Sequence, residues 1–147
     1  MELILDTNAL SAAADGHPVV AAHLTAADRI AIPVIVLGEY RFGILQSRRR
    51  NEYERWLADT TAVARVLEIT EATTFYYAAI RIELKRSGRP IPSNDLWIAA
   101  LCREPARLVT QDHRDLVLHV DSGVIVIAKF FRRRAISRKH QRSAGFS

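Results

Sequence analysis

The sequence predicts an α/β fold in which helices flank a mostly parallel central sheet. Short apolar runs, of a length typical of strands, alternate along the chain with longer segments of helical pattern. The chain has 147 residues, of which 49% are hydrophobic and 25% charged, as in an ordinary globular protein. That length suits a single domain with a core of its own.

The element boundaries follow from these patterns and from the positions of proline. Strands are expected at 2–5, 30–35, 64–68, 107–110 and 124–128. Helices are expected at about 18–28, 36–47 and 51–60, then from Thr70 to Ser87, and onward from Ser93. Pro18 suits a first helical turn, whereas Pro33 cannot donate to a sheet ladder and predicts a short or edge strand.

The longest predicted helix is the one that follows position 70. Phe75, Ala79 and Ile82 recur within it at helical spacing. Gly88, with Pro90 just beyond it, is a typical stop signal, so we expect the helix to end there.

The composition argues against several classes of protein. No apolar run approaches the roughly 18 residues of a membrane span, and the acidic start Met1-Glu2 has no signal-peptide pattern. The single cysteine, Cys102, excludes an intrachain disulfide and a thiolate cluster for zinc. We therefore expect a cytoplasmic protein.

The net charge of +5 comes from the C-terminal end of the chain. From Lys129 onward the sequence has seven basic residues and no acidic one. Residues 1–128 hold the other 14 basic residues and all 16 acidic ones, a net charge of −2. We predict a folded domain over 1–128 and a basic tail over 129–147 that is flexible or depends on a partner.

Four acidic residues follow apolar segments in positions that can meet at one edge of the sheet. Asp6 ends the first strand, and Asp112 follows the strand at 107–110. Glu39 and Asp95 lie in the first turns of two helices. Ligands of parallel α/β folds bind at the carboxyl ends of the strands. Carboxylates about 4 Å apart repel by about 4 kcal/mol at an effective dielectric near 20, so such a group needs raised pKa values or a divalent cation, and oxygen ligands suit Mg²⁺ or Mn²⁺.

Each acid also has a local explanation. Asp6 can cap the next helix, and Asp112 can cap the turn that follows it. Asp95 in a first turn favours the helix dipole, typically by about 0.3–1 kcal/mol. Glu39 can be a solvent-facing helical residue. One shared site explains all four positions together, and we favour it.

Four segments of the sequence resemble the acidic motifs of the PIN-domain ribonucleases, and most closely those of the VapC toxins of bacterial toxin–antitoxin modules. They are ILDTNAL at the start, VLGEYRFG at 36–43, IPSNDLWIAA at 91–100 and LVTQDHRDL at 108–116. Their order and spacing match over residues 1 to about 128. The resemblance implies a PIN-like three-layer sandwich and a metal-dependent endoribonuclease that hydrolyses RNA phosphodiesters as the toxin of a type II pair.

The resemblance also implies roles for individual residues. The catalytic acids would be Asp6, Glu39, Asp95 and Asp112. One or two Mg²⁺ or Mn²⁺ ions would be held by the metal ligands Asp6, Asp95 and Asp112. The accessory residues would be Thr7, Asn8, Asn94, Thr110 and Asp115. The chain departs from the pattern at Tyr40, where an aliphatic residue is more usual, and in its long basic tail.

The chemistry implied by the family is attack of a water on the phosphodiester, leaving a 5′-phosphate and a 3′-hydroxyl. Cations must then guide RNA past the acids, and the candidates are Arg41, Arg48, Arg49, Arg86 and Arg89, although solvated helix ends explain them equally well. The implied partners are a VapB-type antitoxin, the RNA substrate and a second copy in a homodimer. An apolar strip for the antitoxin can include Phe42, Ile44, Leu45 and Trp56, which core packing explains equally well.

Three rival interpretations stay open at this point. A phosphatase of the haloacid dehalogenase type needs a second aspartate two residues after the first, and Asn8 stands there. A non-catalytic PIN-like module would bind RNA or a protein without turnover, and the intact acids argue against it. The basic tail could itself be an RNA-binding arm, with steeply salt-dependent affinity.

Overall fold

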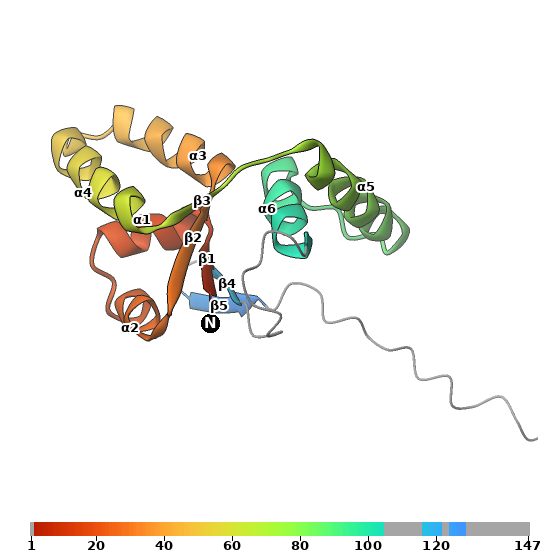
Figure 1. Cartoon of the computed structure of the whole chain (residues 1–147), viewed down its shortest axis with the longest axis horizontal. Helices are drawn as coiled ribbons and strands as arrows, with labels where there is room; N and C mark the ends of the chain where they lie inside the picture. Colours follow the sequence, from red (N-terminus) through yellow and green to blue (C-terminus); the bar gives the residue numbers. More distant parts are fainter. Residues whose placement is uncertain (1, 105–115, 122–123, 129–147) are drawn as a thin grey trace, which may run out of the picture.

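The computed structural model describes residues 2–104, 116–121 and 124–128, which form a sheet with helices on both sides (Figure 1). The strands are β1 (Glu2–Leu5), β2 (Arg29–Pro33), β3 (Arg65–Leu67), β4 (Leu116–Asp121) and β5 (Val124–Ala128). The helices are α1 (Thr7–Ala14), α2 (Pro18–Ala26), α3 (Val34–Leu45), α4 (Arg50–Val63), α5 (Glu71–Arg86) and α6 (Ser93–Arg103). No described helix is long and apolar enough to cross a membrane.

The strands form one sheet in the order β3-β2-β1-β4-β5. β1 pairs in parallel with β2 and β4, and β2 pairs in parallel with β3, whereas β5 runs antiparallel to β4. β1 is therefore the central strand, and burial on both faces accounts for its continuous apolar run. The predicted α/β fold with a mostly parallel sheet is confirmed, and the residue after β1, Asp6, lies in the middle of one sheet edge.

The two faces of the sheet are covered by different sets of helices. Successive strand residues point to opposite faces, so Leu3 and Leu5 pack into a large core with α1, α2, α3 and α4. Ile4 points the other way and packs with Leu67 and with Leu101 of α6 in a much smaller core. Figure 1 shows α1 to α4 on one side of the strands and α5 and α6 on the other.

Helix α5 reaches the sheet through α6. Ile80 of α5 is fully buried against Leu96 of α6, and the rings of Tyr77 and Trp97 stack with centroids 4.1 Å apart. Phe75 and Ile82, whose spacing helps to predict the helix, lie on its exposed side, where Phe75 is 72% exposed. Their spacing therefore predicts the helix correctly and does not identify its buried face.

The structure differs from the predicted elements at several boundaries. The segment TNALSAAA forms α1, which is missing from the predicted helices although a cap at Asp6 requires a helix there. Likewise β4 is not expected, and the strand predicted at 107–110 lies outside the described residues. The strand expected to reach position 35 ends at Pro33, which stands at the N-cap position of α3, so this helix begins at Val34 rather than at 36.

The residues proposed for an exposed apolar strip divide between the core and the surface. Ile44 is buried, and Trp56 is half-buried against the large core, so these two are core residues. Phe42 and Leu45 are exposed by 67% and 59%. The predicted division into 1–128 and 129–147 stays a prediction, because positions 129–147 lie outside the described residues.

Candidate functional site

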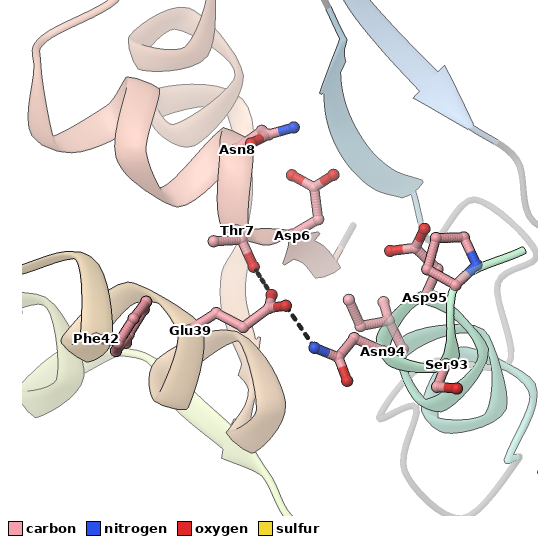
Figure 2. Close-up of a pocket in the computed structure, with 10 residues that line it drawn as sticks. Asp6, Thr7, Asn8, Glu39, Phe42, Ser93, Asn94 and Asp95 are labelled. Carbon is pink, nitrogen blue, oxygen red and sulfur yellow. Dashed lines mark hydrogen bonds between the residues drawn. The ribbon is translucent and has the colours of Figure 1, made fainter.

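A cleft of about 640 Å³ opens where β1 ends, between α1, α3 and α6 (Figure 2). Three of the predicted acids line it, each from a different element: Asp6 after β1, Glu39 on α3 and Asp95 on α6. Asn8 and Asn94 line it too, with Thr7 beside them. The structure thus brings together every predicted catalytic or accessory residue that lies in the described part of the chain, namely Asp6, Thr7, Asn8, Glu39, Asn94 and Asp95.

Asp6 has a structural role as well as a place in the cleft. It is the N-cap residue of α1, with an extended backbone, and its Oδ1 accepts a hydrogen bond of 2.7 Å from the Ala9 amide. Its side chain is buried, with 7% exposed. The local explanation of Asp6 is therefore correct, and it does not compete with a role in the site.

Glu39 is tied to both neighbouring elements. One of its carboxylate oxygens accepts a hydrogen bond from the Thr7 hydroxyl on α1, and the other accepts one from the Asn94 amide on α6. Figure 2 shows these two bonds, which run from Glu39 to Thr7 and from Glu39 to Asn94. Because both oxygens are engaged, Glu39 is fixed in one orientation and connects the two walls.

The first turn of α6 supplies the opposite wall. Pro92, at the N-cap position, makes no side-chain cap, and Ser93, Asn94 and Asp95 follow it into the cleft. Asp95 is half-buried and lies where the helix dipole favours negative charge. The sequence IPSND therefore begins the helix and presents the polar residues of the site at the same time.

The predicted site also includes residues of the fourth motif. Asp112, Thr110 and Asp115 lie outside the described residues. Within the described residues, no three His, Cys, Asp or Glu side chains are grouped closely enough to hold a metal ion. The predicted ligand set includes Asp112, so it stays a prediction.

The cleft includes four residues that are absent from the predicted catalytic and accessory set. Phe42 and Ile98 lie three residues after Glu39 and Asp95 on their helices, which puts each on the same helical face as its acid. Pro92 and Ser93 directly precede the polar pair of α6. Phe42 and Ile98 could have been predicted from the sequence, because each lies three residues after an acid on the same helix.

The predicted RNA-contact arginines lie outside the cleft lining. Arg41 is on α3, Arg48 and Arg49 precede α4, Arg86 ends α5, and Arg89 follows it. Among them, Arg49 is paired with Glu52 and also donates a 3.0 Å hydrogen bond to the Tyr53 hydroxyl. Its charge is thus partly neutralised by an acid in the first turn of α4.

The donor chemistry of the cleft fits a hard divalent cation. The side chains that line it offer carboxylate, amide and hydroxyl oxygens, and the described lining has no thiol, imidazole or basic group. Mg²⁺ and Mn²⁺ prefer such oxygen ligands. A cation would also offset the repulsion among the three acids.

Comparisons with known proteins agree with the fold of the chain. The PIN domain family matches residues 3–122. Ribonuclease VapC5 of Mycobacterium tuberculosis is 34% identical over 127 residues, covering 84% of this chain and 93% of the relative. Ribonuclease VapC2 of Rickettsia felis is 32% identical over 120 residues, covering 78% of this chain and 90% of the relative.

A similar solved structure is a complex. It is VapBC2 of Rickettsia felis bound to a DNA fragment from its promoter, with a TM-score of 0.61 and 31% sequence identity. The match covers 68% of this chain and 79% of the chain in that complex.

Proposed function

This chain belongs to the VapC ribonucleases of the PIN-domain family, the toxins of VapBC toxin–antitoxin modules, and from that premise we propose that the cleft between α1, α3 and α6 is where it hydrolyses RNA. The observation that carries the proposal is the meeting of Asp6, Glu39 and Asp95 from three elements at the carboxyl end of β1. Members of this family typically depend on a metal, and we propose Mg²⁺ or Mn²⁺ here.

The proposed roles follow from how each side chain is held. Asp6 and Asp95 would hold the cation together with Asp112. A bound cation would supply charge that offsets the phosphodiester and lowers the pKa of a water. Glu39 keeps Thr7 and Asn94 in place, so that the polar side chains of both walls are already oriented when RNA binds.

The reaction is a hydrolysis at phosphorus. Water forms the new phosphorus–oxygen bond as the bond to the ribose 3′ oxygen breaks. The 3′ oxygen gains a proton and the water loses one, which leaves a 5′-phosphate and a 3′-hydroxyl. No covalent intermediate with the protein is needed.

We also propose the partners and the setting that this function implies. A VapB-type antitoxin would restrain the enzyme in the cytoplasm, and the toxin would form a homodimer within that assembly. The similarity to the VapBC2 complex supports an antitoxin partner. The exposed side chains of Phe42 and Leu45, next to the cleft on α3, suit such a contact. RNA would pass the surface arginines Arg41, Arg48, Arg86 and Arg89, whereas the charge of Arg49 is engaged by Glu52.

The test is cleavage of total cellular RNA by protein freed from antitoxin, with Mn²⁺, with Mg²⁺ and with EDTA. We expect discrete fragments with 5′-phosphates in either metal and none in EDTA. The Asp95→Asn variant should yield no fragments while keeping its thermal unfolding temperature. Intact RNA in every lane, from a folded protein, would favour a non-catalytic binding module instead.

A further inference from the structure

A second pocket lies beside the cleft, between the C-terminal half of α5 and the start of α6. It has a volume of about 330 Å³, and its lining includes Arg81, Leu84, Lys85, Ile91, Ser93 and Leu96. Ser93 also lines the acidic cleft, so the two cavities adjoin at the first turn of α6. We call this second cavity the α5–α6 pocket.

The charge of the α5–α6 pocket is opposite to that of the cleft. Arg81 and Lys85 are one helical turn apart on α5, so both side chains stand on the face that borders the pocket. Neither forms an ion pair with any described residue, and both are exposed. Elsewhere in the described chain, Arg49, Arg50, Arg65 and Arg103 are all paired with acids.

The floor of the α5–α6 pocket is apolar. Leu84, Ile91 and Leu96 provide it, together with Pro90 at the rim. Leu96 is buried and packs on Ile80, so this floor is part of the rigid contact between the two helices. A cavity with an apolar floor and cations at the rim suits a ligand that is flat and apolar on one side and anionic on the other.

From these observations we infer that the α5–α6 pocket binds one nucleotide of the RNA next to the phosphodiester that is cleaved. Arg81 and Lys85 hold its phosphate, and the apolar floor takes its base. Single-stranded RNA is recognised by this combination of cations for the backbone and apolar or planar groups for unstacked bases. The inference rests on the proposed function of the adjoining cleft.

The position of the pocket agrees with that assignment. Ser93 lines both cavities, so a ligand in the pocket lies next to the acidic cleft. The acids of the cleft repel a polyanion, and cations directly beside them hold the strand in place. Binding energy from a neighbouring nucleotide would thereby position the phosphodiester over Asp6 and Asp95.

The test measures binding without turnover, so that it is separate from cleavage. A fluorescently labelled RNA hexamer is titrated with protein in EDTA at several salt concentrations, and anisotropy is recorded. We expect the Arg81→Gln/Lys85→Gln variant to bind about tenfold more weakly than the wild type. The slope of log affinity against log salt should be shallower by about 1.4, the value for two lost contacts to a single strand.

The matched control is Arg29→Gln/Arg55→Gln, which removes the same charge. Arg29 is exposed at the amino end of β2, and Arg55 is exposed on α4, on the other side of the sheet from α5 (Figure 1). We expect the control to bind RNA within about twofold of the wild type with an unchanged salt slope. Arg81→Lys, which keeps the charge, should also keep the slope. Equal losses in the test and control variants would overturn the inference.

Two further binding measurements distinguish a nucleotide from a phosphate chain and from a protein partner as the ligand of the pocket. Inorganic polyphosphate of matched charge should bind the wild type more weakly than the RNA hexamer, and equal binding would overturn the assignment of a base to the pocket. Antitoxin affinity should be unchanged by the two substitutions. Loss of antitoxin binding with unchanged RNA binding would assign the pocket to a protein partner and overturn the inference. If the wild type never cleaves RNA, the proposed function fails whatever the hexamer shows.

Discussion

Asp6 and Asp95 face the same cleft from opposite sides of the fold, and their surroundings differ. Asp6 begins α1, in the layer that holds the large core, and its carboxylate caps that helix. Asp95 stands in the first turn of α6, in the layer with the small core, and is half-buried. Because α6 also packs Ile98 into the large core, the wall that carries Asp95 contacts both layers, whereas the wall that carries Asp6 belongs to the large core.

The basic residues divide in a related way. In the layer of α1 to α4, Arg49 just before α4 and Arg50 at its start are paired with acids of that helix. On α5, by contrast, Arg81 and Lys85 border a pocket and are paired with no described residue. The contrast is therefore between arginines engaged by an acid, such as Arg49, Arg50 and Arg103, and the two cations that border the α5–α6 pocket. The predictions below test this division, from the largest effect to the smallest.

The largest effect is expected at Asp6, because its carboxylate both lines the cleft and caps α1. Asp6→Ala and Asp6→Asn should each lower RNA cleavage by more than about 100-fold, because even the outer partners of metal ligands are worth about 10–100-fold. Asp6→Ala should also lower the free energy of unfolding by about 0.5–2 kcal/mol through loss of the cap, whereas Asn caps as well as Asp. Urea unfolding of both variants measures the difference. Equal destabilisation by the two would show that the cap is not what Asp6 contributes.

The next effect concerns the bonds that hold Glu39 between the walls. Thr7→Val and Asn94→Ala each remove one donor to its carboxylate, and we expect cleavage rates lower by about 10–100-fold with little change in RNA affinity. Thr25→Val is the matched control, because that threonine bonds only its own exposed helix α2 in the described contacts. If Thr7→Val cleaves RNA as fast as the control does, the hydrogen bond from Thr7 to Glu39 does not contribute to cleavage.

A stability effect of opposite sign is expected in the large core. Burial raises the pKa of Tyr40 to about 12, and its hydroxyl has no hydrogen-bond partner among the described residues. Tyr40→Phe should therefore raise the free energy of unfolding by about 1 kcal/mol, since an unpaired buried polar group is costly. Tyr53→Phe is the contrasting variant: it loses a 2.6 Å bond to Asp15 and should be destabilised. Destabilisation by Tyr40→Phe would mean that its hydroxyl has a partner after all.

The smallest effect is expected at Arg49. Its pairing with Glu52 lowers the pKa of that glutamate, so the stabilisation is present at neutral pH and is lost as the pH falls through the lowered pKa. Because this charge is already neutralised, Arg49→Gln should change RNA affinity by less than about twofold. In the hexamer titration, a loss as large as that of Arg81→Gln/Lys85→Gln would contradict this expectation and support an RNA contact at Arg49.

Much of this arrangement could be predicted from the sequence because the signals are local. The apolar run of β1, the start of α6 at Ser93 and the end of α5 before Gly88 agree with the structure. The acids could be grouped because strand ends and helix starts meet at one edge of a parallel sheet. Asp6 shows why a cap signal and a site signal need not be alternatives, since one carboxylate does both.

What could not be predicted depends on packing between distant segments. The bonds from Thr7 and Asn94 to Glu39 join residues 32 and 55 positions apart, and no local pattern encodes them. The face of α5 that is buried is the one that packs against α6. An apolar spacing that includes the exposed Phe75 and Ile82 could not identify that face. The α5–α6 pocket arises from the same contact, which explains why Arg81 and Lys85 do not stand out in the sequence.

The central claim is that the acids of the cleft act together as a site for a divalent cation. The most direct measurement is Mn²⁺ binding without RNA, by isothermal titration calorimetry, for the wild type, Asp95→Asn and the control Asp59→Asn, whose aspartate is exposed on α4. We expect the wild type and Asp59→Asn to bind Mn²⁺ equally and Asp95→Asn to bind at least about tenfold more weakly. Equal binding by all three proteins, or none by the folded wild type, would contradict the claim.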